Sequence, residues 1–447
     1  MSAGGTILPL SSTVSRQMQP ANGGPLTTPG SIDHTGIRRS VLEDLALKTI
    51  YVEGEVSVRV LAERMGLGFA VAEDLFQRLR KRKLCDVSAM DGLVPRITPN
   101  GSGAARALEL LAANQYVGPA PVALADYVHR VREQSIGLVE VGAADVDRAF
   151  ENLVLGPDLR KQLGIAILAA RSIVLYGPSG TGKTAIAELI PDVYQGGVWI
   201  PHAVEHDSQI ITVYDPTVHR RIEGSQPLDS DRRWVLCERP RVTVGGELTI
   251  EMLDLQFNPS SGVYVAPLQM KANNGVLIVD DFGRQRIPPE ALLNRWIVPL
   301  DRKIDFLTLR GGKKFEMPFD CLVVFSTNLE AAGVFTLNHE TSALNDDAFL
   351  RRIPNKIRLD FVSTDEFREI FRRVCAAFGV PFDATIADQL MAYLHTDLKQ
   401  QLRPCYARDL VQQVCWEAQF EKRAPVLDWQ SLTRACHTYF LASGAVR

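Results

Sequence analysis

An eight-residue stretch, GPSGTGKT at positions 177–184, constrains what this chain can fold into more than any other feature. Its glycines allow successive backbone N–H groups to turn inward around an anion. An apolar segment, 172–176, precedes the stretch and a helical pattern follows it, so the positive end of a helix is expected at the same anion. This context predicts a phosphate-binding loop made of Gly177, Pro178, Ser179, Gly180, Thr181, Gly182, Lys183 and Thr184. Lys183 is expected to reach the β- and γ-phosphates of ATP, and Thr184 to bind Mg²⁺.

Two adjacent carboxylates follow a second apolar segment, 276–279. In a parallel sheet the carboxyl ends of the strands meet at one edge, so Asp280 and Asp281 are expected beside the phosphate loop. Asp280 is predicted to hold Mg²⁺, directly or through water. Asp281 is predicted to orient or deprotonate an attacking water. The competing interpretation is a strand followed by a carboxylate cap.

Because these two motifs occur in this order, residues 145–447 resemble the AAA+ ATPases. The resemblance implies an α/β fold, with a AAA+ P-loop NTPase core built on a parallel sheet and a C-terminal helical lid. It also implies a homo-oligomeric, hexameric ring that hydrolyses ATP to ADP and phosphate and remodels a partner macromolecule. The second acidic residue of the family is usually Glu, so Asp281 is a departure. A nucleotide-dependent scaffold with negligible turnover therefore stays an alternative.

Three later positions extend the resemblance. Asn328 follows an apolar segment and looks like the sensor-1 asparagine, which helps to position the water. The segment 347–353 looks like the one that supplies the arginine finger, and Arg352 fits the pattern better than Arg351. Arg408 matches the sensor-2 arginine of the lid, which contacts the nucleotide. A solvated basic pair and an ordinary surface position are the competing interpretations of these arginines.

The chain between the phosphate loop and the paired carboxylates is longer than a minimal core requires. It holds strand-like pieces, including 241–244, which is followed by a hairpin signal at Gly245-Gly246. A second hairpin is expected over 304–317. These insertions resemble the helix-2-insert clade with a pre-sensor-1 hairpin, which includes MoxR-like ATPases.

Composition and periodicity divide the chain into five segments. The first is rich in Gly, Pro, Ser and Thr and has too little apolar surface to offset its ordering entropy. The second contains three helices, a hairpin and a closing helix, which is similar to a winged helix. The expected segments are a disordered tail at 1–38, a winged-helix-like domain at 39–116, a linker at 117–144, the AAA+ core at 145–362 and the helical lid at 363–447.

The partner is not identified by the sequence. A basic run at 78–83 ends the third helix, but Glu73 and Asp74 in its first half would repel phosphates. A protein partner and a DNA-associated, ATP-dependent regulator or loader therefore both stay open. The net charge of −3 argues against a globally basic nucleic-acid coat. The chain lacks a signal-peptide pattern and an apolar run of ~18–20 residues, so we expect a cytoplasmic protein without membrane insertion.

Overall fold

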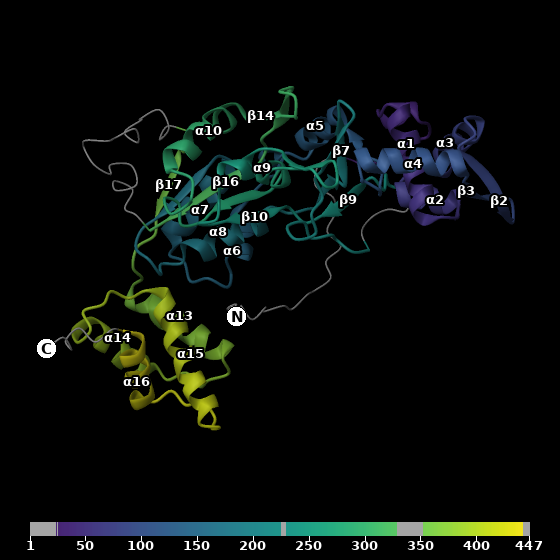
Figure 1. Ribbon diagram of the computed structural model, residues 1–447. Helices are drawn as coiled ribbons and strands as arrows, with labels where there is room; N and C mark the ends of the chain where they lie inside the picture. Colours follow the sequence, from purple (N-terminus) through teal and green to yellow (C-terminus); the bar gives the residue numbers. More distant parts are fainter. Residues whose placement is uncertain (1–23, 25, 225–228, 329–351, 441–447) are drawn as a thin grey trace.

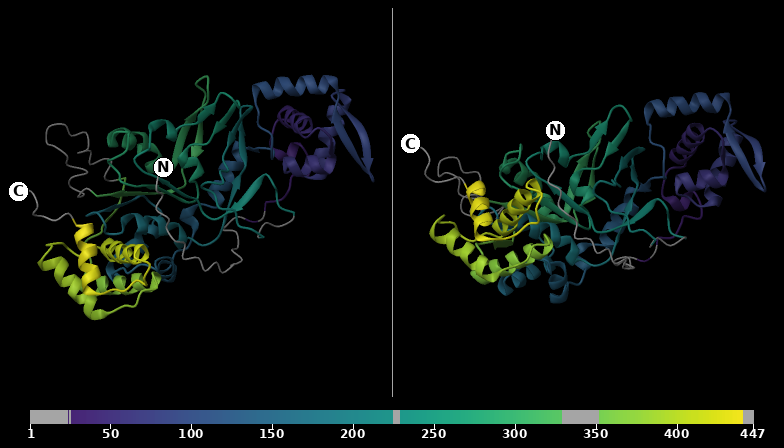
Figure 2. Two further views of the ribbon diagram at one scale, coloured as in Figure 1. Left: turned by 60° about the horizontal axis from the view of Figure 1, so that its bottom comes forward. Right: turned by 90° about the horizontal axis from the view of Figure 1, so that it is seen from below.

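The computed structural model describes residue 24 and residues 26–224, 229–328 and 352–440. A central α/β unit carries the N-terminal helices and hairpin at one end and a group of C-terminal helices at the other (Figure 1). The two further views show the same separation of the terminal units (Figure 2). Within the described ranges, no helix has the length and apolar character needed to cross a membrane.

The centre of the molecule is a five-stranded sheet in the order β10-β13-β16-β5-β17. Each neighbouring pair is parallel. Every residue of β13 and β16 is buried, as expected for strands covered on both faces. The bounds are β5 Ile173–Tyr176, β10 Arg241–Val244, β13 Val276–Val279, β16 Leu322–Thr327 and β17 Asn355–Arg358. The α/β core with a parallel sheet that the sequence predicted is confirmed.

Alternate residues of these strands are buried in two separate apolar cores. Ile278 and Val324 face one core, which is closed by helices α6 (Ala143–Ala149), α7 (Pro157–Leu168) and α8 (Lys183–Leu189). Leu277 and Val323 face the other core, where Trp296 of α10 (Pro289–Arg302) is fully buried. Burial on both faces holds the strand ends in fixed positions, which is the prerequisite for a site at one edge.

Further strands lie beside this sheet. A mixed sheet has the order β11-β12-β8-β7-β4, with β4 Val122–Ala123, β7 Ala203–His206, β8 Gln209–Thr212, β11 Gln256–Asn258 and β12 Val263–Val265. Strands β6 Val198–Pro201 and β9 Trp234–Cys237 form an antiparallel pair. The hairpin expected at 304–317 is confirmed as β14 Ile304–Thr308 and β15 Lys314–Pro318. The hairpin expected at Gly245-Gly246 is wrong, because β10 pairs in parallel with β13.

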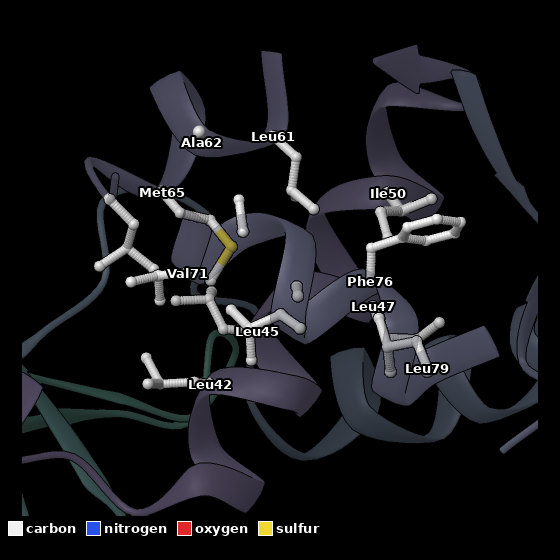
Figure 3. Close-up of a cluster of buried hydrophobic side chains, with 14 of the residues drawn as sticks. Leu42, Leu45, Leu47, Ile50, Leu61, Ala62, Met65, Val71, Phe76 and Leu79 are labelled. Atoms are coloured by element: carbon white, nitrogen blue, oxygen red, sulfur yellow. The ribbon is translucent and has the colours of Figure 1, made fainter. Parts of the chain in front are cut away.

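The N-terminal unit contains the helices and hairpin expected from its periodicity. Its apolar core gathers side chains from all three of its first helices, including Leu45, Met65 and Phe76 (Figure 3). A small sheet has the order β1-β3-β2. The bounds are α1 Arg39–Glu53, β1 Val56–Ser57, α2 Val58–Met65, α3 Phe69–Lys81, β2 Cys85–Asp91, β3 Val94–Pro99 and α4 Gly101–Ala113.

The segment expected to be a disordered tail is partly packed, and the expected linker adds a strand to a neighbouring sheet. Ile32 and Ile37 are buried in the N-terminal core, although they lie in the segment expected to be a disordered tail. Residues 1–23 and 25 of that tail lie outside the described residues. The expected linker at 117–144 contains β4, which pairs with β7, and helix α5 (Leu124–Glu133). Ile32, Ile37 and Val122 are buried, and this burial offsets part of the entropy cost of ordering these segments.

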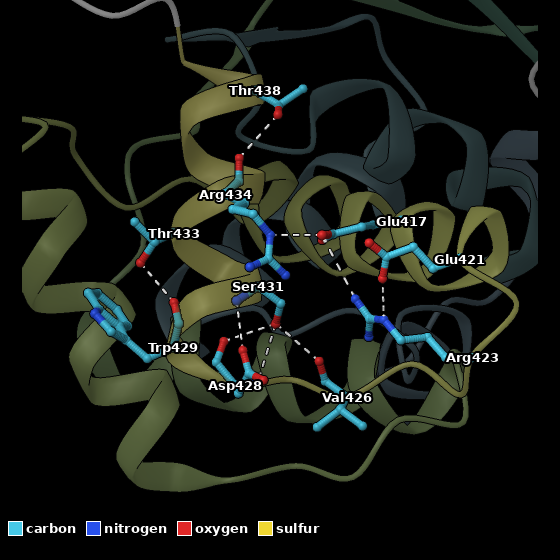
Figure 4. Close-up of polar contacts among 10 residues, drawn as sticks. All are labelled: Glu417, Glu421, Arg423, Val426, Asp428, Trp429, Ser431, Thr433, Arg434 and Thr438. Carbon is cyan, nitrogen blue, oxygen red and sulfur yellow. Dashed lines mark hydrogen bonds and ion pairs between the residues drawn. The ribbon is translucent and has the colours of Figure 1, made fainter.

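The C-terminal unit consists of helices around one apolar core. Ser363 and Glu366 form the expected capping box at the start of α13. Near the C-terminal end of α15, Glu417 accepts a hydrogen bond of 2.7 Å from Arg434 of α16, which joins the last two helices (Figure 4). The helices are α13 Thr364–Ala377, α14 Ala384–Thr396, α15 Pro404–Phe420 and α16 Trp429–Tyr439.

Candidate functional site

The predicted phosphate loop joins β5 to α8 at the carboxyl edge of the central sheet. Gly177, Gly180 and Gly182 have φ values of 134°, 79° and 91°, a region that strongly favours glycine. A Cβ at Gly177 would lie 2.1 Å from the carbonyl oxygen of Leu359, and one at Gly180 would lie 2.5 Å from Sγ of Cys405. The loop is therefore fixed both by backbone conformation and by close approach of its neighbours.

Lys183 turns its side chain back over this loop. Its Nζ donates hydrogen bonds to the carbonyl oxygens of Gly177 and Pro178, at 3.0 and 2.7 Å. The residue is 5% exposed, and this burial lowers the pKa of Lys183, while Asp280 and Asp281 oppose the shift. Both hydrogen-bond acceptors are neutral, so the lysine charge is available to an anion in the loop.

Thr184 and Asp280 place oxygen atoms together beside the loop. The hydroxyl of Thr184 donates to both carboxylate oxygens of Asp280, at 3.1 and 3.0 Å. A hydroxyl and one carboxylate, completed by phosphate oxygens and water, fit the hard oxygen ligands that Mg²⁺ prefers. In the described part of the chain, no cluster of three or more His, Cys, Asp or Glu forms a separate metal site.

Asp281 and Asn328 meet across the ends of β13 and β16. The amide Nδ2 of Asn328 donates to Oδ1 of Asp281 at 2.9 Å. Asp281 has a φ of 47°, in the left-handed region that Asp tolerates better than most residues.

The turn that follows β13 is tied to its surroundings. Phe282 donates its N–H to the carbonyl of Ser326 at 2.7 Å, which binds the turn to β16. Gln285 donates from Nε2 to the carbonyls of Asp280 and Asp281 at 2.8 and 3.1 Å. Gln285 is not among the residues predicted from the sequence, because it belongs to none of the motifs there and its contacts depend on the turn.

Arg352 lies away from the phosphate loop of its own chain. Its carbonyl accepts a hydrogen bond of 2.9 Å from the hydroxyl of Ser172, the residue immediately before β5. The phosphate loop begins at the other end of β5. This strand has four residues and, at ~3.3 Å per residue, is about 13 Å long. The structure therefore does not bring Arg352 to the loop. Arg351 lies outside the described residues.

The lid meets the phosphate loop through the start of α15. Arg403 donates from Nη1 to the carbonyl of Ser179 at 3.2 Å, and the N–H of Cys405 donates to the carbonyl of Gly180 at 3.4 Å. The predicted sensor residue, Arg408, is exposed and lies about one helical turn beyond Cys405. Arg403 is not among the residues predicted from the sequence; it lies at the N-cap of the same helix and contacts the loop directly.

Comparison with known proteins gives limited matches. A family profile described as "Domain of unknown function (DUF8689)" matches residues 363–438, which form most of the lid. No curated protein matches the chain. The chain is similar to the Thermotoga maritima RuvB Holliday junction branch migration motor, with 16% identity and a TM-score of 0.36 over 64% of this chain and 70% of that chain. It is also similar to NtrX from Brucella abortus in complex with ATP, with 16% identity and a TM-score of 0.39 over 63% of this chain and 55% of that chain.

The chain's own geometry defines its class more sharply than these matches do. The phosphate loop, the parallel strands and the carboxylates at their carboxyl edge make it an α/β P-loop core.

Proposed function

We propose that this chain is an ATP-hydrolysing AAA+ protein that binds ATP with Mg²⁺ and uses hydrolysis to remodel a partner protein. One observation carries the proposal: two hydrogen-bonded pairs converge on the phosphate loop. Thr184 contacts Asp280, and Asp281 contacts Asn328, although these residues come from α8, the end of β13 and the end of β16. Such convergence of a phosphate cradle, a cation site and an acid–base pair supports phosphoryl transfer to water.

Each residue has a distinct part in this reaction. The loop N–H groups and Lys183 would bind the β- and γ-phosphates, and Thr184 and Asp280 would hold Mg²⁺, which neutralises phosphate charge when bound. Asn328 would position a water in line with the γ-phosphate. The water oxygen forms a bond to phosphorus, the bond to the ADP oxygen breaks, and Asp281 accepts the water proton.

The Mg²⁺ role can be tested with the isosteric variant Thr184→Val, which removes the hydroxyl and keeps the volume. The variant should lose affinity for ATP in the presence of Mg²⁺ by about tenfold, yet bind ATP in EDTA as the wild type does. Isothermal titration under both conditions measures this difference. Equal affinity of variant and wild type in Mg²⁺ would remove the proposed cation site.

We also propose that the protein forms a ring and that Arg352 acts in the active site of a neighbouring subunit. Two facts support this arrangement. Arg352 is anchored to Ser172 at the amino end of β5, away from its own loop. An arginine that offsets charge on the transferred phosphoryl group must reach that group, so its target lies in another copy. The hexameric state follows from the AAA+ resemblance.

For the N-terminal unit, which we propose to be a winged-helix module, the contacts favour a protein partner. Two cations of the basic run are neutralised, since Arg78 pairs with Asp74 at 2.9 Å and Arg82 pairs with Glu43 at 2.8 Å. The tip of its β2–β3 hairpin presents Leu93, which is 96% exposed. An exposed apolar tip and a partly neutralised basic run suit a protein surface better than a phosphate backbone.

The DNA-associated alternative keeps one supporting observation. Arg80, Lys81 and Lys83 are exposed and form no ion pair with the described residues. If they contact phosphates, replacing Lys81 and Lys83 by Glu should abolish binding to duplex DNA and the wild-type affinity should fall steeply with salt. An absence of salt-dependent DNA binding by the wild-type chain would remove this alternative.

A further inference from the structure

We propose that Gln285 is a positioning residue, which holds Asp281 in the backbone conformation that aims its carboxylate at the attacking water. The inference rests on the proposed ATPase function and adds a residue that the function does not include. In the turn after β13, the side chain of Gln285 contacts several backbone groups.

The carboxamide of Gln285 satisfies three backbone groups of this turn. Its Nε2 donates to the carbonyl of Asp280 at 2.8 Å and to the carbonyl of Asp281 at 3.1 Å. Its Oε1 accepts from the N–H of Gly283 at 2.8 Å. The two carbonyls belong to the peptide units before and after Asp281. Fixing both units fixes the φ and ψ of Asp281.

The φ of 47° at Asp281 is less favourable than a right-handed backbone, although Asp tolerates it better than most residues with a Cβ. A left-handed conformation costs a residue with a Cβ roughly 1–2 kcal/mol. Such a conformation persists when the surrounding structure determines it from several sides. Here the N–H of Phe282 is bound to β16, the carbonyl of Asp281 also accepts from the N–H of Arg284, and Gln285 holds the peptide units on both sides of Asp281.

The conformation has a direct effect on the carboxylate. With Asp281 left-handed, its Oδ1 lies 2.9 Å from Nδ2 of Asn328. A relaxed backbone would rotate the Cα–Cβ bond and move the carboxylate away from Asn328. Because a displacement of about 1 Å can reduce a rate by ~10²-fold, loss of the Gln285 hydrogen bonds should slow hydrolysis without removing the base.

Two variants test this role against simple packing. Gln285→Ala removes the hydrogen bonds and the volume, whereas Gln285→Met keeps most of the volume and removes the hydrogen bonds. We expect both to lower kcat by about 10- to 100-fold and to leave the Kd for ATP unchanged. Gln162→Ala on the exposed face of α7 is the matched control and should keep the wild-type kcat. A Gln285→Met variant with wild-type kcat would show that Gln285 only fills space.

A double-variant cycle tests whether Gln285 acts through Asp281. In the Asp281→Asn background, adding Gln285→Ala should lower kcat by less than twofold, because the base that Gln285 positions is already absent. If Gln285→Ala lowers kcat in that background as much as it does in the wild type, or if it weakens ATP binding, the role of Gln285 is wrong while the proposed ATPase function stands. An absence of ATP turnover in the wild-type chain would instead overturn the proposed function and this inference with it.

Discussion

The carboxyl edge of the central sheet and the N-terminal unit use their polar side chains in opposite ways. At the sheet edge, groups from distant parts of the chain contact one another, as Asp281 contacts Asn328 at 2.9 Å. In the N-terminal unit, charged groups pair within the unit, as Arg82 pairs with Glu43 at 2.8 Å. In the function that we propose, the sheet edge acts on a bound nucleotide, whereas the N-terminal unit presents a surface to a partner.

This difference separates the effects expected from changes in the two regions. Variants at the sheet edge should alter ATP binding or its hydrolysis. Variants on the exposed surface of the N-terminal unit should leave both unchanged.

Lys183→Ala should give the largest effect, with ATP binding weakened by ~10²-fold or more and turnover below detection. The lysine is the buried cation of the loop, and each hydrogen bond between a charged donor and phosphate contributes about 1.5–3 kcal/mol. Equilibrium binding of a fluorescent ATP analogue measures the loss. Wild-type affinity in this variant would mean that the loop does not bind the phosphates.

Arg352→Ala should bind ATP as the wild type does and hydrolyse it ~10³–10⁵-fold more slowly. If Arg352 acts across an interface, mixing this variant with Lys183→Ala creates some interfaces with both residues intact. Mixed rings should then regain part of the activity, with subunit exchange confirmed by labelled protein. Full activity of Arg352→Ala alone would transfer the role to Arg351.

Asp281→Asn should keep ATP affinity and slow hydrolysis by ~10²-fold, the usual scale for a positioned acid–base group. The amide keeps the size and tolerates the left-handed backbone, but it cannot accept the proton from water. Phosphate release under saturating ATP measures the rate. Unchanged release would show that another group is the base.

Variants in the lid should change ATP binding less than Lys183→Ala does, and they distinguish between Arg403 and Arg408. Arg403→Ala should weaken ATP binding by ~3- to 10-fold, because it removes a contact of 3.2 Å that joins the lid to Ser179. Arg408→Ala is the comparison variant. It should weaken ATP binding more than Arg403→Ala does only if bound nucleotide draws the exposed Arg408 side chain toward the loop. Titration of both variants with ATP therefore decides which arginine couples the lid to the loop.

Leu93→Asp in the N-terminal unit should have the smallest effect, with ATP affinity and basal turnover within twofold of the wild type. The side chain is 96% exposed and touches no part of the proposed site. A loss of basal turnover in this variant would show that the two regions are coupled more tightly than their separate contacts indicate.

The sequence predicted the elements that depend on local patterns. Residues 177–184 and the carboxylates after β13 could be located because strand, loop and turn signals occupy adjacent positions. Asn328 was selected because the apolar segment before it resembles the strand that carries the sensor-1 asparagine of AAA+ ATPases. The hairpin expected at Gly245-Gly246 was wrong, since the pairing of β10 with β13 depends on segments far apart in the chain.

Residues whose roles depend on tertiary contacts could not be found in this way. Gln285 differs from any other glutamine only through the turn that surrounds it. Arg403 reaches Ser179 only because the lid packs against the loop. Ile32 and Ile37 lie among residues typical of disorder, yet they are buried because the N-terminal helices offer an apolar surface.

The most direct test of the account is the release of phosphate by the wild-type chain at saturating ATP with Mg²⁺. We expect steady release of one phosphate and one ADP for each ATP consumed, dependent on Mg²⁺ and reduced to background in Lys183→Ala. ATP binding with no product above that background would contradict it, and would show that the site holds nucleotide as a scaffold rather than hydrolysing it.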